Sequence, residues 1–418
     1  MLNSLEKKYE IERATMMTIL VATLGYFVDI FDLLLFNIVR VQSLKDLGVS
    51  GDGLLESGIF LLNVQMAGLL VGGIIWGVWG DRMGRVSVLF GSILMYSIAN
   101  ILNGFVQSVE QYALLRFIAG VGLAGELGAG VTLASELLPR NLRGLGTTFI
   151  ASIGVAGAVF AAVIADIADW RVAYMIGGVM GLGLLVLRLQ VKESAMFEVM
   201  SKQGEMARKM LKPGNPLMLL RPKSLKKYVA VIVVGMPIWA VVGLFITFTP
   251  EFAKAFGMTG ELPTAGSAVL FCYVGLVIGD MFSGLLSQLL RSRKKAVSIF
   301  LVLTGVFSCV YVWGPHHSQQ SYYGLCLLLG IGTGYWAMFV QMGAEQFGTN
   351  IRATAATSIP NMVRGSVILI TTLFSLLKAY LDVITAGLCV VGLMIALAFI
   401  ALASLKETFG TDLDYLEE

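Results

Sequence analysis

The sequence predicts an all-α membrane protein with twelve transmembrane helices in two six-helix halves. Of its 418 residues, 57% are hydrophobic and only 14% are charged, and the mean hydropathy is +0.81. Long apolar segments recur along the whole chain, and one short motif and one glycine recur at the same fixed offset. Because soluble domains carry about 25% charged residues, the composition excludes most soluble enzymes and nucleic-acid-binding proteins.

Each of twelve apolar segments is long enough to cross the hydrocarbon core, which takes roughly 20 helical residues. The 48 glycines are expected where helices pack closely in lipid. The twelve spans are expected at residues 14–38, 57–80, 86–106, 111–137, 144–168, 172–189, 228–250, 264–290, 295–314, 320–344, 354–379 and 382–405.

One long polar stretch, residues 190–227, divides the chain. It is rich in basic residues and is expected to be a cytoplasmic linker. The predicted organisation is therefore an N-terminal six-helix bundle at 1–189, the linker at 190–227, and a C-terminal six-helix bundle at 228–418.

The ends of the fourth and tenth spans resemble one another. Residues 136–143 read ELLPRNLR and residues 345–352 read EQFGTNIR, so Glu, Asn and Arg recur at the same spacing. Gly125 and Gly334 are related by the same offset. Two related halves are typical of secondary transporters.

Most of the 30 lysine and arginine residues fall in segments that lie inside if the N-terminus is cytoplasmic. The positive-inside rule therefore predicts that both termini are cytoplasmic. The N-terminus lacks a short apolar core with a cleavage site, so we expect no cleaved signal peptide. The four cysteines lie in apolar segments and predict neither disulfides nor a metal site.

The loop between the second and third spans carries a specific motif. Residues 77–85 read GVWGDRMGR, which resembles the cytoplasmic signature of the major facilitator superfamily. A degenerate copy in the second half has Gln288 where the acid would stand. The fourth span and its exit are similar to the branch of sugar, phosphate and metabolite proton symporters. The resemblance implies the fold and alternating access, but it does not identify a substrate.

Opposite charges at the cytoplasmic rim are expected to form pairs when this side closes and to be solvated when it opens. Simple positive-inside anchoring is the alternative, but it does not explain the acidic members. The expected gate consists of Asp81, Arg82, Arg85, Glu136, Arg143, Glu345 and Arg352.

Ionisable residues inside membrane helices usually face a cavity or a functional partner. Asp29 and Asp32 are three residues apart and share a helix face. Arg116 and Glu126 lie in the fourth span. The resemblance implies that Asp32 interacts with Arg116, and we predict that Asp32, with Asp29 and Glu126, handles protons. A static ion pair between the first and fourth spans is the alternative.

Arg364 lies in the middle of the eleventh span with no acid close in sequence. A buried guanidinium without an anion is costly, so we predict that it binds an organic anion. The rival is a pair between Arg364 and Asp280, which would favour a neutral sugar or polyol. The other expected contacts to substrate are Asn361, Gln341, Trp336, Tyr335, Trp239 and Asp280.

The sequence thus predicts a proton-coupled symporter that imports a small organic anion across an inner (plasma) membrane. Facilitated diffusion, transport of a neutral sugar or polyol, and a non-transporting receptor are the alternatives. No cofactor, metal site, enzymatic activity or nucleic-acid partner is expected. Protons, the substrate and the lipid bilayer are the expected partners of a functional monomer.

Overall fold

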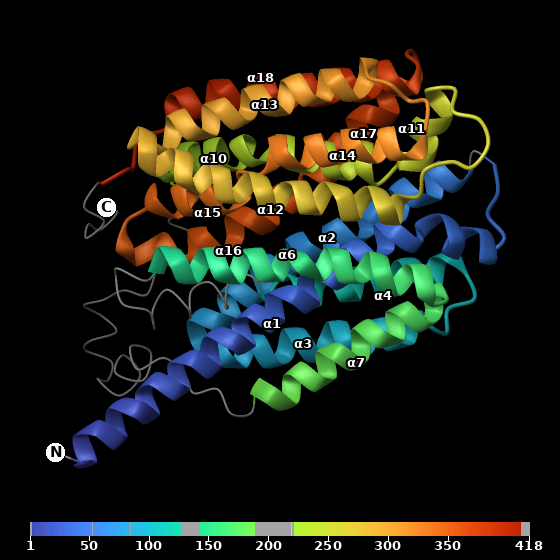
Figure 1. The fold of residues 1–418 in the computed structure, drawn as a ribbon. Helices are drawn as coiled ribbons and strands as arrows, with labels where there is room; N and C mark the ends of the chain where they lie inside the picture. Colours follow the sequence, from blue (N-terminus) through green and yellow to red (C-terminus); the bar gives the residue numbers. More distant parts are fainter. Residues whose placement is uncertain are drawn as a thin grey trace.

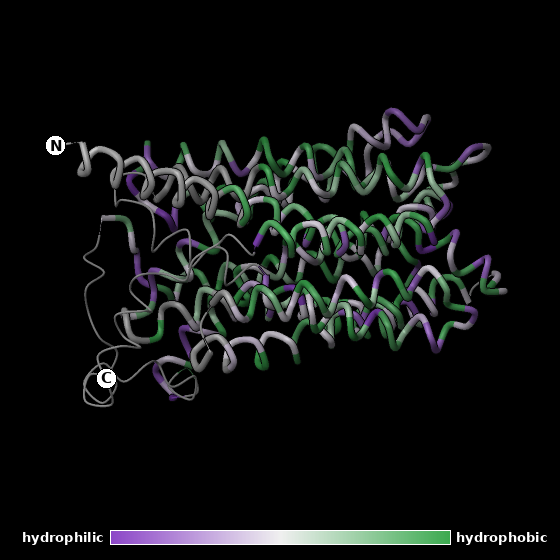
Figure 2. The backbone as a smooth tube through the Cα atoms, turned by 90° about the horizontal axis from the view of Figure 1, so that it is seen from below, coloured by the Kyte–Doolittle hydropathy of each residue, from purple (hydrophilic) through white to green (hydrophobic). Residues whose placement is uncertain are grey.

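The computed structural model describes residues 2–51, 53–83, 85–126, 143–188, 219 and 221–410. The helices run roughly along one direction, with α1–α7 forming one half and α10–α18 the other (Figure 1). The start of α1 and the end of the described chain lie at the same end of the bundle. Hydrophilic residues lie mostly toward the helix ends, and hydrophobic residues predominate in the middle of the helices (Figure 2).

Most helices of the first half begin within four residues of the predicted spans, but α1 is much longer than the predicted span 14–38. The expected fourth span continues to residue 137, and its last part lies outside the described residues. The helices of this half are α1 (Leu2–Asp46), α2 (Gly53–Met83), α3 (Arg85–Asn103), α4 (Val109–Leu123), α6 (Arg143–Ile167) and α7 (Trp170–Arg188).

Three predicted spans of the second half are interrupted. The seventh changes to a π-helix after Pro237, the tenth breaks at Gly334, and the eleventh breaks at Ser366. The helices are α10 (Pro222–Ala240), η2 (Val241–Ile246), α11 (Thr249–Ala255), α12 (Ala265–Leu290), α13 (Arg293–Trp313), α14 (Gln319–Thr333), α15 (Trp336–Glu345), α16 (Thr349–Gly365), α17 (Val367–Lys378) and α18 (Val383–Ser404).

Eight of the described helical stretches are long and apolar enough to cross a membrane, and two shorter apolar helices accompany them. The protein is therefore a multi-pass membrane protein. Helix α10 begins at Pro222 rather than at residue 228, because proline suits the first turn of a helix. The six residues 222–227, expected in the linker, are thus helical.

Polar side chains cap the N-termini of several helices. Ser108, Thr264, Ser318 and Asp382 each accept backbone N–H groups at the start of α4, α12, α14 and α18. These caps satisfy N–H groups that have no partner within the helix. They also fix where these helices begin, and each of these helices begins within two residues of its predicted start.

Glycine allows two helix pairs to approach at backbone distance. In the first half, a Cβ at Gly68 would collide with the Phe117 carbonyl, and one at Gly120 with that of Gln65, so α2 and α4 touch. In the second half, Gly275 and Gly330 hold α12 against α14 in the same way. Such close contacts stabilise helix pairs in lipid through packing.

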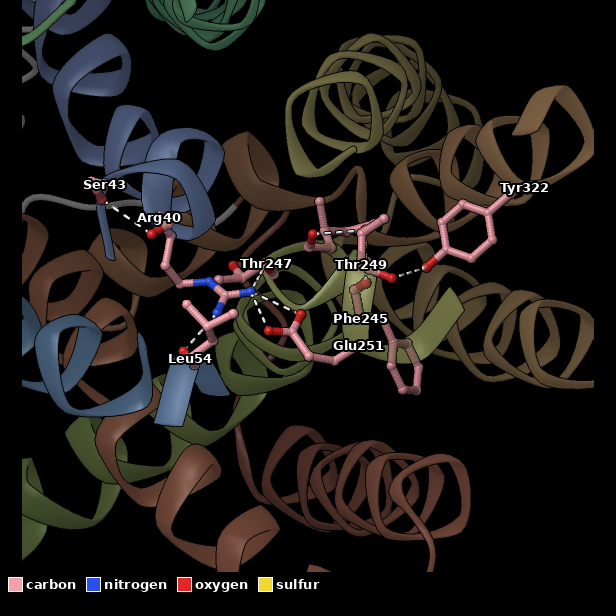
Figure 3. Close-up of polar contacts among 9 residues, drawn as sticks. Arg40, Ser43, Leu54, Phe245, Thr247, Thr249, Glu251 and Tyr322 are labelled. Atoms are coloured by element: carbon pink, nitrogen blue, oxygen red, sulfur yellow. Dashed lines mark hydrogen bonds and ion pairs between the residues drawn. The ribbon is translucent and has the colours of Figure 1, made fainter. Parts of the chain in front are cut away.

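The two halves are joined at the end of the bundle opposite the start of α1. The Arg40 guanidinium, fully buried on α1, donates to both carboxylate oxygens of Glu251 on α11 at 2.7 and 2.8 Å (Figure 3). It also donates to the Leu54 carbonyl at 3.1 Å and lies 4.6 Å from the Phe248 ring centroid. By the predicted orientation this is the outer end.

We expect Gly330→Val to lower the free energy of unfolding by about 1–3 kcal/mol, because its side chain would overpack the α12–α14 contact. Thermal unfolding in detergent measures this. Gly324→Val is the matched control on the same helix, since no atom lies within 4 Å of its Cβ position. Equal destabilisation by both substitutions would show that the contact does not limit stability.

Arg40→Ala is expected to separate the outer ends of the halves, because it removes the charged contact between α1 and α11. Spin labels at the exposed positions Lys45 and Lys254 report their distance. The control is Arg171→Ala, whose guanidinium contacts only first-half groups among the described residues, Val106 and Trp170. Identical distance distributions for Arg40→Ala and Arg171→Ala would contradict the role of the pair.

Candidate functional site

Four charged side chains meet in the interior of the bundle, all with no exposed surface. Asp29 and Asp32 come from α1, Arg116 from α4 and Arg364 from α16. The sequence singled out each of them because ionisable residues are rare in membrane helices. The structure arranges them as two separate ion pairs.

The first pair, Asp32 with Arg116, lies entirely within the first half. Arg116 Nη1 is 3.6 Å from the Asp32 carboxylate and donates to Asn100 Oδ1 at 3.3 Å. Its guanidinium also faces the rings of Phe36 and Tyr174 at 5.8 and 5.2 Å. These contacts join α1, α3, α4 and α7, so the pair implied by the resemblance is present.

The second pair crosses between the halves. Arg364 Nη2 lies 3.2 Å from Asp29 Oδ2. One turn earlier on α16, the Asn361 amide donates to the Ala124 carbonyl of the first half at 2.9 Å. The expectation that Arg364 has no carboxylate partner within the protein was wrong. The alternative expectation, that Arg364 pairs with Asp280, was also wrong. Separation in sequence gives no information about which helices pack against each other across the interface.

This second pair leaves hydrogen-bonding groups unused. Arg364 Nε and Nη1 and Asp29 Oδ1 are buried and have no hydrogen-bond partner in the described part of the chain. An arginine can donate five N–H bonds in a fixed fork, and buried polar groups are normally satisfied. The guanidinium can therefore accept another anion, and a carboxylate is the anion that matches its geometry.

Buried aromatic side chains occur on helices of both halves. Tyr26 lies on α1 and Tyr273 on α12. Trp336 packs edge-on against Trp239, with ring centroids 6.4 Å apart. The expected Trp239 and Trp336 thus lie together, whereas Tyr26 and Tyr273 were missed because single aromatics in apolar helices give no sequence signal.

Glu126 belongs to a different cluster. Its carboxylate receives two hydrogen bonds from Arg188 on α7, at 2.9 and 2.6 Å, and one from Ser92 at 2.9 Å. Arg188 lies at the end of the predicted sixth span, and it is only 2% exposed. Glu126 therefore does not share a partner with Asp32.

Three expected substrate contacts have other partners. Asp280 Oδ1 accepts the Ala337 backbone N–H at 3.0 Å, at the start of α15. Tyr335 donates to the Val234 carbonyl at 3.0 Å and so supports the break in the tenth span. Gln341 is exposed and donates to Glu345 at 2.9 Å. None of these contacts involves Arg364.

The expected cytoplasmic gate falls largely beyond what the structure describes. Glu345 contacts Arg293 at 3.6 Å and accepts from Thr408 at 2.7 Å, both within the second half. Glu136 lies outside the described residues. So do the side chains of Asp81, Arg82, Arg85, Arg143 and Arg352.

Known proteins resemble this chain along most of its length. It is 28% identical to the 4-hydroxybenzoate transporter PcaK of Pseudomonas putida over 276 residues, covering 59% of this chain and 61% of the relative. It is 23% identical to the benzoate transport protein of Acinetobacter baylyi over 369 residues, covering 80% and 78%.

The fold matches a solved transporter. The proton:xylose symporter XylE, bound to 6-bromo-6-deoxy-D-glucose, superposes with a TM-score of 0.70 at 17% identity, covering 96% of this chain and 98% of that one. The sequence profile of the Major Facilitator Superfamily matches residues 22–372. The chain therefore belongs to the major facilitator superfamily and is a membrane transporter, not an enzyme.

Proposed function

We propose that this transporter imports a small aromatic carboxylate together with a proton across the inner membrane, by alternating access. The observation that carries the proposal is the buried pair of Asp29 and Arg364, which joins the halves and leaves Arg364 Nε and Nη1 unused. A substrate carboxylate bound to Arg364 would replace Asp29 as the anionic partner of the guanidinium.

Charge balance then couples the substrate to a proton. If a carboxylate replaces Asp29 at Arg364, Asp29 becomes a buried anion without a partner. Breaking a buried pair costs about 3–5 kcal/mol for this reason. Protonation of Asp29 removes that cost, so one proton and one carboxylate together leave the net charge of the site unchanged.

Asp32 is less suited to this exchange. Its partner Arg116 lies in the same half and is also held by Asn100 and two aromatic rings. Opening and closing the interface leaves such a pair intact. We therefore assign the substrate-linked proton to Asp29, and we assign Asp32 to fixing α1 against α4.

The substrate's apolar part would meet aromatic rings. Tyr26, Tyr273 and Trp336 are buried aromatic side chains on helices of both halves, and a flat ring can stack or pack edge-on with such side chains. The relatives from Pseudomonas putida and Acinetobacter baylyi are named for 4-hydroxybenzoate and benzoate. These names and the arginine favour an aromatic acid over a neutral sugar.

The purified protein in liposomes is expected to accumulate 4-hydroxybenzoate or benzoate when the outside is made acidic. Each carboxylate should carry a proton inward, so adding substrate alkalinises the outer medium. Xylose is the comparison for a neutral substrate. Sugar accumulation without uptake of either acid would contradict the proposal, and acid uptake without a pH change would indicate facilitated diffusion.

Asp29→Asn is expected to retain exchange of labelled for unlabelled substrate but to lose accumulation, because asparagine imitates the protonated acid. Arg364→Gln should weaken carboxylate binding at least tenfold, since a buried charged partner is lost. Binding by tryptophan fluorescence and uptake in liposomes measure the two effects.

The double variant Asp29→Asn with Arg364→Gln controls for folding, because it leaves neither charge unpaired. It should be as thermally stable as Asp29→Asn yet should not bind the acid. If Arg364→Gln binds the carboxylate normally while folded, Arg364 is not the anion site.

A further inference from the structure

Arg40 on α1 is a buried cation near the outer end of the bundle. Its side chain has no exposed surface. Arg40 follows Asp29 by eleven residues on the same helix, which places it roughly 16 Å further out along α1 in the predicted orientation. A buried guanidinium is costly without an anionic partner, so the groups that contact Arg40 matter for any movement at this end.

The second half supplies Arg40 with a carboxylate and an aromatic ring. Arg40 Nη2 donates to both carboxylate oxygens of Glu251, at 2.7 and 2.8 Å (Figure 3). The Phe248 ring centroid lies 4.6 Å from the guanidinium carbon, within the range of a cation–π interaction. A carboxylate and an aromatic ring are also the two parts of an aromatic acid. The second half therefore presents to Arg40 the same chemistry as the proposed substrate.

One N–H group of Arg40 is unused. Its Nε is buried and has no hydrogen-bond partner within the described residues, whereas Nη1 donates to the Leu54 carbonyl at 3.1 Å. The Nε and an adjacent Nη of a guanidinium form a fork that fits the two oxygens of a carboxylate. Since Glu251 uses Nη2 alone, a free carboxylate can make a hydrogen bond to Arg40 that Glu251 does not make.

The first half holds the Arg40 guanidinium by itself. A Cβ at Gly58 on α2 would lie 2.7 Å from both Arg40 Cδ and Nη1, so the side chain rests against the backbone of α2. Leu54, whose carbonyl accepts from Nη1, lies one turn earlier on the same helix. These contacts do not involve the second half, so they can persist when the halves separate at the outer end.

We propose that Arg40 is an entry site for the aromatic carboxylate, which deepens the proposed function and rests on it. When the outer ends separate, Arg40 loses Glu251 and Phe248, because both belong to the other half. The carboxylate and the ring of the substrate then replace them. When the halves approach again, Glu251 binds Arg40 and releases the substrate toward Arg364, the anion site deeper in the bundle.

Binding of labelled benzoate to purified variants tests the proposal. The background is the double variant Asp29→Asn with Arg364→Gln, which lacks the inner anion site while Glu251 still occupies Arg40. Adding Glu251→Gln removes the competing carboxylate, and we expect this triple variant to bind benzoate at least tenfold more tightly than the background, since the buried cation then lacks an anion. Benzamide, which has the ring but no carboxylate, should not compete.

Glu261→Gln in the same background is the matched control. Glu261 is an exposed acid in the loop after α11, and its contact with Gln319 is through its backbone carbonyl. This substitution should not tighten benzoate binding. Adding Arg40→Gln to the Glu251→Gln variant should abolish the binding gained, and it leaves neither charge of the pair alone.

Thermal unfolding in detergent is the second measurement, because a ligand that binds only the folded state raises the unfolding temperature. Benzoate should stabilise the Glu251→Gln variant but not the variant that also carries Arg40→Gln. This comparison holds even if the unpaired Arg40 makes the Glu251→Gln variant less stable without ligand.

Benzoate binding by the Glu251→Gln variant that is no tighter than the background overturns the entry site, as does tight binding that persists after Arg40→Gln. Either result leaves the proposed symport intact, because uptake by the unchanged protein tests that separately. If the unchanged protein takes up no aromatic acid, the proposed function fails, and the entry role of Arg40 fails with it.

Discussion

The requirement that a charge buried in hydrocarbon must have a partner governs this structure. Asp29 and Arg364 satisfy it for each other across the interface between the halves, at 3.2 Å and without exposure to solvent. Neither half alone could bury its own member of the pair at low cost. The contact between the halves is therefore electrostatic at this pair.

A contact between moving parts must be exchangeable rather than permanent. Packing contacts made by Gly68, Gly120, Gly275 and Gly330 lie within one half and can persist through a conformational change. The Arg40–Glu251 contact at the outer end and the Asp29–Arg364 contact in the interior lie between the halves. Only such cross-interface contacts must break when the halves rock, and substrate or protons can compensate for the loss.

The sequence by itself determined the helices and the types of residue in the site. Apolar length and the breaks between spans placed the described helix starts mostly within a few residues, because the lipid core sets helix length. Asp29, Asp32, Arg116, Glu126 and Arg364 could be identified since few charges occur in such segments. The signature at residues 77–85 indicated the family, and the family match over residues 22–372 confirmed it.

Only the tertiary structure decided which charges meet. Arg364 is 335 residues from Asp29, and helix periodicity gives no information about contacts between separate helices. The same limit hid the Arg188 partner of Glu126 and the Arg40 contact to Glu251, which looked like charges at helix ends. Pairing depends on how helices cross, and crossing is set by small residues and backbone breaks spread over the whole bundle.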